Sequence, residues 1–390
     1  MTKIITTLTL IFCFLTISLT LEARQIVTGQ VTEELDGIPV PLASVFIAGT
    51  TIGTHTDIDG NFSLTVPIQG NFQIVVSHIG FLPVSHTVDT PQSSHQINFA
   101  LQKRIEILAE VVVTPCLPHR RRDENLFWQL LLGERPSNRG MQVLNPEVVQ
   151  FCLHDNGTFR AFADEPIEIV NHHMGYHILY ILQSFEHDGR GPRLLGMPFF
   201  TELTPENERQ KTNWKSRRQR AYPTSLIRFL RSLYQEQLYE NGFVLAKMEQ
   251  DRLIPLSLTP EDSIRMGIAE SFDASFANPN VITSFSYSQI LQREAEAVQI
   301  NTEQRMFLAF TSRRITDVMS NPARIFDNSS LFIEFFPLNI TIFADGSYSG
   351  TLHLWEHRGT TTQLRTKLPL DFRLNESVSR TSIFRLRRGS

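Results

Sequence analysis

The segment His353-Leu354-Trp355-Glu356-His357 contains the residue types of a catalytic zinc site, two histidines and a carboxylate within five positions. On a helix, residues four positions apart share a face, so both imidazoles could bind one ion. The segment follows an Asp-Gly turn, however, and its alternation of polar and apolar residues is typical of a strand. Histidines four positions apart on a strand lie about 13 Å apart, too far to share one ion. We therefore predict no zinc site here.

A second group of histidines, His172, His173 and His177, lies close to His187 and Asp188. On a helix His173 and His177 could bind zinc, with His187 or Asp188 as a third ligand. The surrounding residues alternate as in a β-strand, and no nearby carboxylate has a spacing from these histidines that would make it a metal ligand. We interpret the group as the polar edge of a strand and predict no metal ion and no other cofactor.

The other patterns of catalytic sites are missing from the sequence. The pentad Gly346-Ser347-Tyr348-Ser349-Gly350 has tyrosine where a nucleophile elbow needs serine. Neither a phosphate-binding loop nor a dinucleotide-binding glycine pattern occurs. We therefore predict no catalytic residues, no cofactor-binding residues and no enzymatic activity.

Basic residues are concentrated around Trp214: Lys211, Lys215, Arg217, Arg218 and Arg220. Such a stretch with an aromatic ring suits polyanions such as lipopolysaccharide or nucleic acid. The alternative is a solvated helix face with Trp214 and Tyr222 packed inward, the commoner role of short charged stretches. The net charge of −4 gives no general attraction to nucleic acid, and we expect no nucleic-acid partner.

The N-terminus has the organisation of a signal peptide over residues 1–23. Lys3 precedes a run of apolar and hydroxyl-bearing residues from Ile4 to Leu21, and Leu21-Glu22-Ala23 is an imperfect cleavage site. The apolar core is short for a membrane anchor, and no later stretch is long enough to cross a membrane once this segment is removed.

Two cysteines remain after removal of the predicted signal peptide, Cys116 and Cys152. They could pair in an oxidising compartment. Alternatively, Cys116 could be a free thiol and Cys152 a small apolar residue of a strand.

Residues 24–103 alternate with period two and are broken by turn residues, which predicts a β-sandwich of about seven short strands. The apolar positions on one face are Val27 and Val31, then Ala43-Val45-Ile47, Phe62-Leu64-Val66 and Ile97-Phe99-Leu101. Asp57-x-Asp59-Gly60 lacks the later carboxylates of a calcium loop, so we interpret it as a tight turn.

This region resembles the carboxypeptidase regulatory-like domain. The resemblance rests on Val27-x-Gly29-x-Val31, on Gly53-Thr54-x-Thr56-Asp57-x-Asp59-Gly60-x-Phe62, and on Ser77-His78-Ile79-Gly80-Phe81, where His78 replaces the usual aromatic. It implies a transthyretin-like fold without catalytic activity. Glu110-Val111-Val112-Val113-Thr114 is similar to the segment that follows such domains in TonB-dependent receptors.

The prolines and arginines around residues 115–122 indicate an extended linker over 104–122, followed by an α+β domain over 123–390. We predict a helix capped by Asp123 and ended near Gly133, with Leu126, Phe127, Leu130 and Leu131 as its apolar stripe. A second helix is predicted over about 224–240, with an apolar face that includes Leu238. Strands are predicted over 149–163 with a turn at Asn156-Gly157, over 167–185, and over 331–336 and 338–355 with a turn at Asp345-Gly346. Residues 251–328 are weakly patterned.

This part resembles a group of exported bacterial proteins that carry the same regulatory-like domain in front. The shared residues include Asn171-x-x-Met174-Gly175-Tyr176, Trp214-x-x-Arg217-x-x-Arg220-Ala221-Tyr222 and Leu368-Pro369-Leu370-Asp371-Phe372. The group implies no activity.

We therefore expect a non-enzymatic envelope protein in the periplasm or at the periphery of the outer membrane, with an envelope protein as partner. One alternative is a relative of, or an accessory to, a TonB-dependent receptor, and another is a zinc metallopeptidase. The sequence leaves the oligomeric state open.

Overall fold

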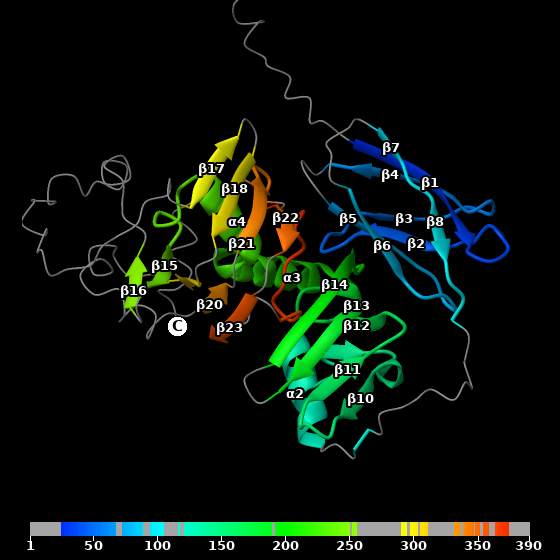
Figure 1. Cartoon of the computed structure of the whole chain (residues 1–390), viewed down its shortest axis with the longest axis horizontal. Coiled ribbons are helices and arrows are strands. Elements are labelled where there is room, and N and C mark those ends of the chain that lie inside the picture. Colours follow the sequence, from blue (N-terminus) through cyan, green and yellow to red (C-terminus); the bar gives the residue numbers. More distant parts are fainter. Residues whose placement is uncertain are drawn as a thin grey trace, which may run out of the picture.

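A computed structural model describes residues 25–67, 72–88, 94–104, 116–117, 121–188, 192–249, 252–255, 290–294, 297–302, 305–310, 331–335, 338–346, 348–351, 354–358 and 363–373. The predicted signal peptide and the segment Glu110–Thr114 lie outside these residues. Several β-sheets with a few helices make up the described chain: a β-rich N-terminal domain and a β-rich later region, consistent with a multi-domain α+β protein (Figure 1).

The N-terminal domain consists of two packed sheets. In the first, β1 (Gln25–Glu33) is antiparallel to β4 (Asn61–Val66) and parallel to β7 (Ser94–Gln96) and β8 (Phe99–Leu101). The second has the order β3 (Gly53–His55), β2 (Ser44–Ile47), β5 (Phe72–Ser77), β6 (Val84–Val88). The predicted apolar positions lie buried between the sheets, apart from the half-buried Ile97. The described part of this domain therefore has eight strands where about seven were expected.

The segment from Asp57 to Gly60 is the predicted tight turn. One carboxylate oxygen of Asp57 accepts hydrogen bonds from the backbone N–H groups of Asp59 (2.9 Å) and Asn61 (2.8 Å). Gly60 has φ +72°, and a Cβ there would lie 2.4 Å from the carbonyl oxygen of Val31. Only glycine fits this position, so the carboxylate shapes a turn.

A six-stranded sheet follows. Its order is β10-β11-β13-β12-β9, and β14 pairs with the other edge of β13; the strands are β9 (Met141–Val143), β10 (Gln150–Leu153), β11 (Phe159–Phe162), β12 (Ile167–Asn171), β13 (Tyr176–His187) and β14 (Pro192–Glu202). A short 3₁₀ helix, η1 (Pro146–Val148), precedes β10. The predicted hairpin turn at Asn156-Gly157 is confirmed, with Gly157 at φ +81°.

Helix α2 (Arg121–Leu132) packs on this sheet (Figure 1). Arg121 and Arg122 are therefore helical, although a linker was expected there, and Asp123 lies in the first turn rather than before it. The buried residues are Phe127, Trp128, Leu131 and Leu132, so the predicted stripe was wrong by about one position. Its sequence is apolar on nearly every side from Leu126 onward, and periodicity alone cannot choose the buried face.

Helix α3 (Glu208–Ala221) begins at the N-cap Asn207 and leads through the 3₁₀ turn η2 (Tyr222–Thr224) into α4 (Leu226–Tyr234). The second helix was predicted to reach residue 240, but it ends at Tyr234. Glu236 has a left-handed backbone at φ +54°, and Leu238 reaches the core from a loop. None of the described helices combines the length and the apolar character needed to cross a membrane.

Two further sheets complete the fold. One has the order β16 (Arg252–Pro255), β15 (Phe243–Glu249), β19 (Met306–Phe310), β20 (Leu331–Phe335), β23 (Leu354–Arg358). The other has the order β17 (Leu291–Glu294), β18 (Ala297–Thr302), β21 (Leu338–Phe343), β22 (Tyr348–Thr351). Helix α4 packs against residues of both, and the predicted turn at Asp345-Gly346 joins β21 to β22.

Cys116 and Cys152 form a disulfide, with their Cα atoms 5.0 Å apart. The next residue, Leu117, donates its backbone N–H to the carbonyl of Leu153 at 2.8 Å. The bond therefore fastens the segment before α2 to strand β10 and answers the question that the sequence left open.

The sandwich is docked on the central sheet through one end. Phe46 of β2 stacks on Phe199 of β14 with ring centroids 4.6 Å apart. In the loop after β2, Gly49 donates its N–H to the carbonyl of Pro198 (2.6 Å), and the carbonyl of Thr50 accepts from Phe200 (2.9 Å). Apolar stacking and paired backbone groups together make this a specific interface.

Residues 363–372, here called the clasp, hold three parts of the fold together. Leu364 donates its N–H to the carbonyl of Leu131 in α2 (2.9 Å), and Leu370 donates to the carbonyl of Gly49 in the sandwich (2.8 Å). The carboxylate of Asp371 accepts from the backbone and the hydroxyl of Thr51. The carbonyl of Phe372 accepts from Arg231 of α4 at 3.1 Å.

Candidate functional site

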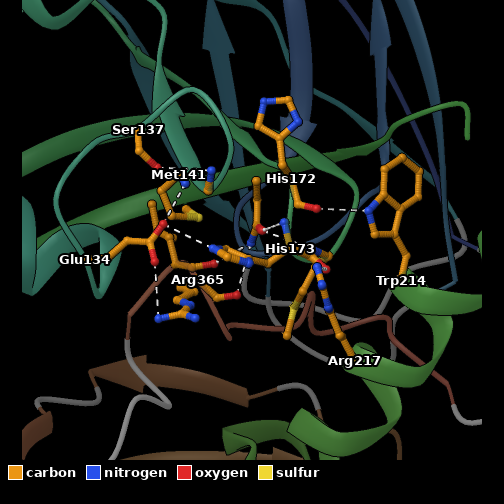
Figure 2. A network of polar contacts seen from close by, with 12 residues as sticks. Glu134, Ser137, Met141, His172, His173, Trp214, Arg217 and Arg365 are labelled. Carbon is orange, nitrogen blue, oxygen red and sulfur yellow. Dashed lines mark hydrogen bonds and ion pairs between the residues drawn. The ribbon is translucent and has the colours of Figure 1, made fainter. Parts of the chain in front are cut away.

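The turn between β12 and β13, residues 171–175, is the meeting point of the side chains whose types suggested chemistry (Figure 2). Asn171 ends β12, and His172 and His173 occupy the turn. Glu134 reaches it from the segment after α2, Arg217 from α3 and Arg365 from the clasp. We call these residues, with Trp214 and Arg218, the turn network.

Asn171 is fully buried and gives the turn its shape. Its side-chain oxygen accepts hydrogen bonds from the backbone N–H groups of His173 and Met174, both at 3.0 Å. Its amide donates to the carbonyls of Leu364 (3.0 Å) and Arg365 (3.2 Å). One side chain thus closes the turn and binds the clasp.

We expect Asn171→Ala to lower the free energy of unfolding by about 2–3 kcal/mol, because it leaves two donors and two acceptors, each buried or partly buried, without this partner. Urea unfolding followed by tryptophan fluorescence measures the change. Asn156→Ala is the matched control, since Asn156 accepts a turn hydrogen bond from Thr158 but is exposed, and it should cost less than about 1 kcal/mol. Equal losses for both variants would contradict this role of Asn171.

The carboxylate of Glu134 is the ionic centre of the network. One oxygen accepts from the backbone N–H of Met141 (2.9 Å) and lies 3.1 Å from Nε2 of His173. The other lies 3.2 Å from Nη1 of Arg365. Burial raises the pKa of Glu134, but the hydrogen bonds from His173 and Met141 and the nearby positive charges outweigh it, so the pKa lies below its ordinary value of 4.5.

The depressed pKa of Glu134 predicts an acid-sensitive contribution to stability. A carboxyl group whose pKa is lower in the folded than in the unfolded chain stabilises the fold above the unfolded value, and this stabilisation is lost as pH falls through the folded-state pKa. Wild type should therefore lose stability relative to Glu134→Gln as the pH falls from 6 to below about 4. Thermal unfolding across this range tests the prediction. A constant difference between the two proteins would show that Glu134 has no such linkage.

Helix α3 donates hydrogen bonds to four consecutive carbonyl groups of the turn. The indole of Trp214 donates to His172 (3.0 Å), and Arg217 donates to His173 (3.1 Å). Arg218 donates to Met174 (2.8 Å) and Gly175 (3.1 Å). A third nitrogen of Arg218 binds Glu202 at 2.8 Å, and the guanidinium lies 4.0 Å from the centroid of the Tyr176 ring. These contacts hold the turn firmly to the helix.

The basic stretch is therefore a helix with Trp214 buried, which confirms the inward packing predicted for this residue. Tyr222 is half-buried. Of the basic residues, Arg217 and Arg218 bind the turn, and Lys211 pairs with Glu208 in the same helix. Lys215 and Arg220 are exposed.

The three clustered histidines contact three different partners. His172 lies 3.0 Å from the side-chain oxygen of Gln142, and His173 contacts Glu134. His177, on β13, lies 3.5 Å from Glu168. The first two lie in a turn, so the prediction of a strand edge was wrong for them and right for His177. Throughout the described ranges, no three His, Cys, Asp or Glu residues are grouped as metal ligands would be.

The predicted strand character of the other histidine motif is confirmed where it can be followed. Glu356 and His357 belong to β23, which pairs with β20. His353 lies outside the described residues. The Gly346-to-Gly350 pentad forms the turn before β22 and the start of that strand, while Ser347 lies outside the described residues.

Residues 27–113 match the family described as the CarboxypepD_reg-like domain. The TonB-dependent receptor SusC of Bacteroides thetaiotaomicron is 44% identical over 91 residues, which cover 23% of this chain and 8% of the receptor. The TonB-dependent receptor P39 of Formosa agariphila is 37% identical over 117 residues, which cover 30% of this chain and 11% of the receptor. The similarity thus spans about a tenth of the length of either receptor, and the N-terminal region of this chain is a CarboxypepD_reg-like domain.

Two solved structures share limited similarity with the chain. A mutant cohesin–X-dockerin complex from Acetivibrio cellulolyticus is 17% identical, with a TM-score of 0.18 over 19% of this chain and 52% of the other. A protein from Bacteroides fragilis is 14% identical, with a TM-score of 0.17 over 41% of this chain and 64% of the other.

Proposed function

We propose that the protein is a non-enzymatic component of the bacterial cell envelope that binds another envelope protein. In this proposal the mature chain lies in the periplasm or at the periphery of the outer membrane. The sandwich has a transthyretin-like fold and acts as an interaction module, and the later sheets hold it in position.

The observation that carries the proposal is the CarboxypepD_reg-like domain at residues 27–113, which this chain has in common with TonB-dependent receptors. Those relatives are named as receptors, so the shared domain is consistent with a role beside such proteins. The sequence also predicts a signal peptide over residues 1–23.

The disulfide between Cys116 and Cys152 supports export. Disulfides form and persist in oxidising compartments such as the periplasm and are rare in the reducing cytosol.

The contacts of the turn network support a non-enzymatic role. Glu134 and His173 contact each other, and the arginines of α3 bind backbone carbonyls. These contacts bind the segment after α2, the turn and helix α3 to one another, which is a structural role for these residues.

The test is cross-linking of the tagged full chain in its native envelope, followed by purification and mass spectrometry. We expect a processed N-terminus near residue 24, fractionation with the envelope, and one reproducible protein partner. Two results would refute the proposal. One is hydrolysis of a peptide or glycan by the purified chain with saturable kinetics. The other is an unprocessed chain in the cytosolic fraction of cells.

A second candidate is an accessory to, or a relative of, a TonB-dependent receptor. The 44% identity with a region of SusC favours it. The same experiment separates the two candidates, because only this one requires the recovered partner to be a TonB-dependent receptor.

A further inference from the structure

The end of the sandwich opposite the docked loop carries a cluster of exposed apolar side chains. It is formed by the loop between β1 and β2 and by the turn between β3 and β4, and we call residues 34–42 and 57–59 the tip. In Figure 1 the chain after β1 projects to the right, away from β13 and β14. The exposed fractions are 79% for Leu35, 54% for Ile38, 75% for Leu42 and 85% for Ile58.

Hydrogen bonds with residues next to the tip hold its two segments at the same end of the domain. Leu42 donates its N–H to the carbonyl of Thr56 at 3.1 Å, and the side chain of Gln30 donates to the carbonyl of Asp59 at 2.9 Å. The N–H of Glu33 binds the carbonyl of Ile38 at 2.8 Å, which folds the first loop back on itself. The four apolar side chains therefore share one end of the domain. Single exposed apolar residues are common, but a group of them marks an interaction surface.

Leu42 is held in a conformation that leucine rarely adopts. Its φ is +58°, in the left-handed region, where a side chain costs about 1–2 kcal/mol relative to glycine. The side chain is largely exposed, so packing within the domain does not offset this strain. Backbone strain that the packing of the side chain does not offset points to a function of this surface.

The charge of the tip distinguishes among possible partners. Four exposed acidic residues flank the apolar residues in the sequence of the tip: Glu34, Asp36, Asp57 and Asp59. The stretch from Gln25 to Gly60 contains no lysine or arginine, and Lys103, which lies next to the tip, is paired with Glu33 at 2.5 Å. An anionic membrane would be repelled by this rim, whereas a protein segment with apolar and basic side chains would be complementary to it.

We propose that the tip is a docking surface for a protein segment in which apolar side chains are flanked by lysine or arginine. This inference rests on the proposed function and specifies the surface that binds the envelope partner and the chemistry of the bound segment. Leu35, Leu42 and Ile58 provide the apolar contact, and Glu34, Asp36 and Asp59 provide charge recognition. Asp57 is excluded from the recognition set because its carboxylate already shapes the turn.

A defined probe tests the chemistry directly. The probe is a fluorescent peptide of alternating leucine and lysine, and its binding to the full chain without the predicted signal peptide is measured by anisotropy. We expect saturable binding that weakens with salt and is lost when glutamate replaces lysine or serine replaces leucine in the peptide. The double variant Leu35→Ser, Ile58→Ser and the triple variant Glu34→Gln, Asp36→Asn, Asp59→Asn should each weaken binding by about tenfold or more.

Matched changes elsewhere on the surface control for general effects. Leu144→Ser, Leu195→Ser removes two exposed leucines of the central domain, and Glu147→Gln, Asp155→Asn, Asp164→Asn removes three exposed acids there. Both should leave binding unchanged. Leu42→Gly should weaken binding without lowering the thermal midpoint, because it removes the side chain and relieves the backbone strain. Peptide binding that is absent, or equally affected by tip and control variants, would overturn the inference.

Photo-cross-linking in cells separates this inference from the proposed function. A photoreactive residue at position 35 or 58 should capture the envelope partner through a segment that contains apolar and basic residues, and one at position 144 or 195 should not. If a partner is recovered by general cross-linking but only through positions 144 or 195, the proposed function holds and the inference fails. Tip-dependent flotation with phosphatidylglycerol vesicles would instead assign the surface to a membrane and refute a protein partner.

Discussion

Replacing Gly175 with alanine is expected to lower the free energy of unfolding by about 4 kcal/mol. Gly175 has φ +70°, which costs an alanine about 1 kcal/mol, and its Cβ would lie 2.3 Å from two carbons of the Trp214 ring. The ring cannot move aside easily because it is buried and its Nε1 donates to the carbonyl of His172. Chemical unfolding followed by circular dichroism measures the loss.

Gly157→Ala is the control for this prediction. Gly157 has a similar φ of +81°, but no heavy atom lies within 4 Å of the position that its Cβ would occupy. It should therefore lose only the backbone term of about 1 kcal/mol. In a Trp214→Leu background, Gly175→Ala should cost less than it does in the wild type, because the two side chains then no longer overlap. Equal effects of Gly157→Ala and Gly175→Ala would show that Trp214 does not confine the turn.

Removing the disulfide should have the second largest effect. The bond joins residues 36 positions apart, and for a loop of that length the restriction of the unfolded chain stabilises the fold by about 3–4 kcal/mol. We expect the variant Cys116→Ser, Cys152→Ala to lose about this amount in urea unfolding, with Trp128 of the neighbouring α2 as one fluorescent reporter. Alanine is chosen at position 152 because Cys152 is buried and serine would add an unpaired hydroxyl there.

Reduction of the wild type provides the matching control. Dithiothreitol should shift the unfolding midpoint of the wild type to that of the double variant and should leave the variant unchanged. A wild type that is insensitive to the reductant under unfolding conditions would mean that these cysteines are not bonded in solution.

The sandwich could be predicted from the sequence because its signals are local. Alternating residues such as Phe62, Leu64 and Val66 fix which face of a strand is buried, and Asp57 and Gly60 fix a turn through contacts within four residues. Strand β3 has three residues and none of them is buried, so the sequence has no alternation of buried and exposed residues there that would predict a strand.

The end of α4 could not be predicted because a tertiary contact determines it. Leucine, glutamine and glutamate after Tyr234 favour a longer helix. Leu238 instead packs in the core beside Phe243, and the N–H of Gln237 binds the carbonyl of Ser232. Burial of an apolar residue outweighed the local helical preference.

The turn network was only partly accessible from the sequence. The donors Trp214, Arg217 and Arg218 have the spacing of one helix face, a pattern that could have indicated a shared acceptor. Glu134 lies 39 residues before His173 in the sequence, and Arg365 belongs to the clasp. No local spacing of residues connects either of them to the turn. Only the folded chain brings them together.

The clasp has a consequence for the order of events in folding. Thr51 and Asp371 are 320 residues apart, so a chain that leaves the ribosome or a translocation channel from its N-terminus exposes the sandwich long before its binding segment emerges. The sandwich can form its own core early. The hydrogen bonds of Gly49 with Leu370 and of Thr51 with Asp371 can form only after the clasp has emerged. The contacts with Phe199 and Phe200 of β14 can form earlier, but the carbonyl of Gly49 and the polar groups of Thr51 stay open to solvent until then. Binding of the clasp would therefore be a late step in folding. A chain cut shortly before residue 363 would keep a folded sandwich but would lack the clasp contacts that help to hold it on the central sheet.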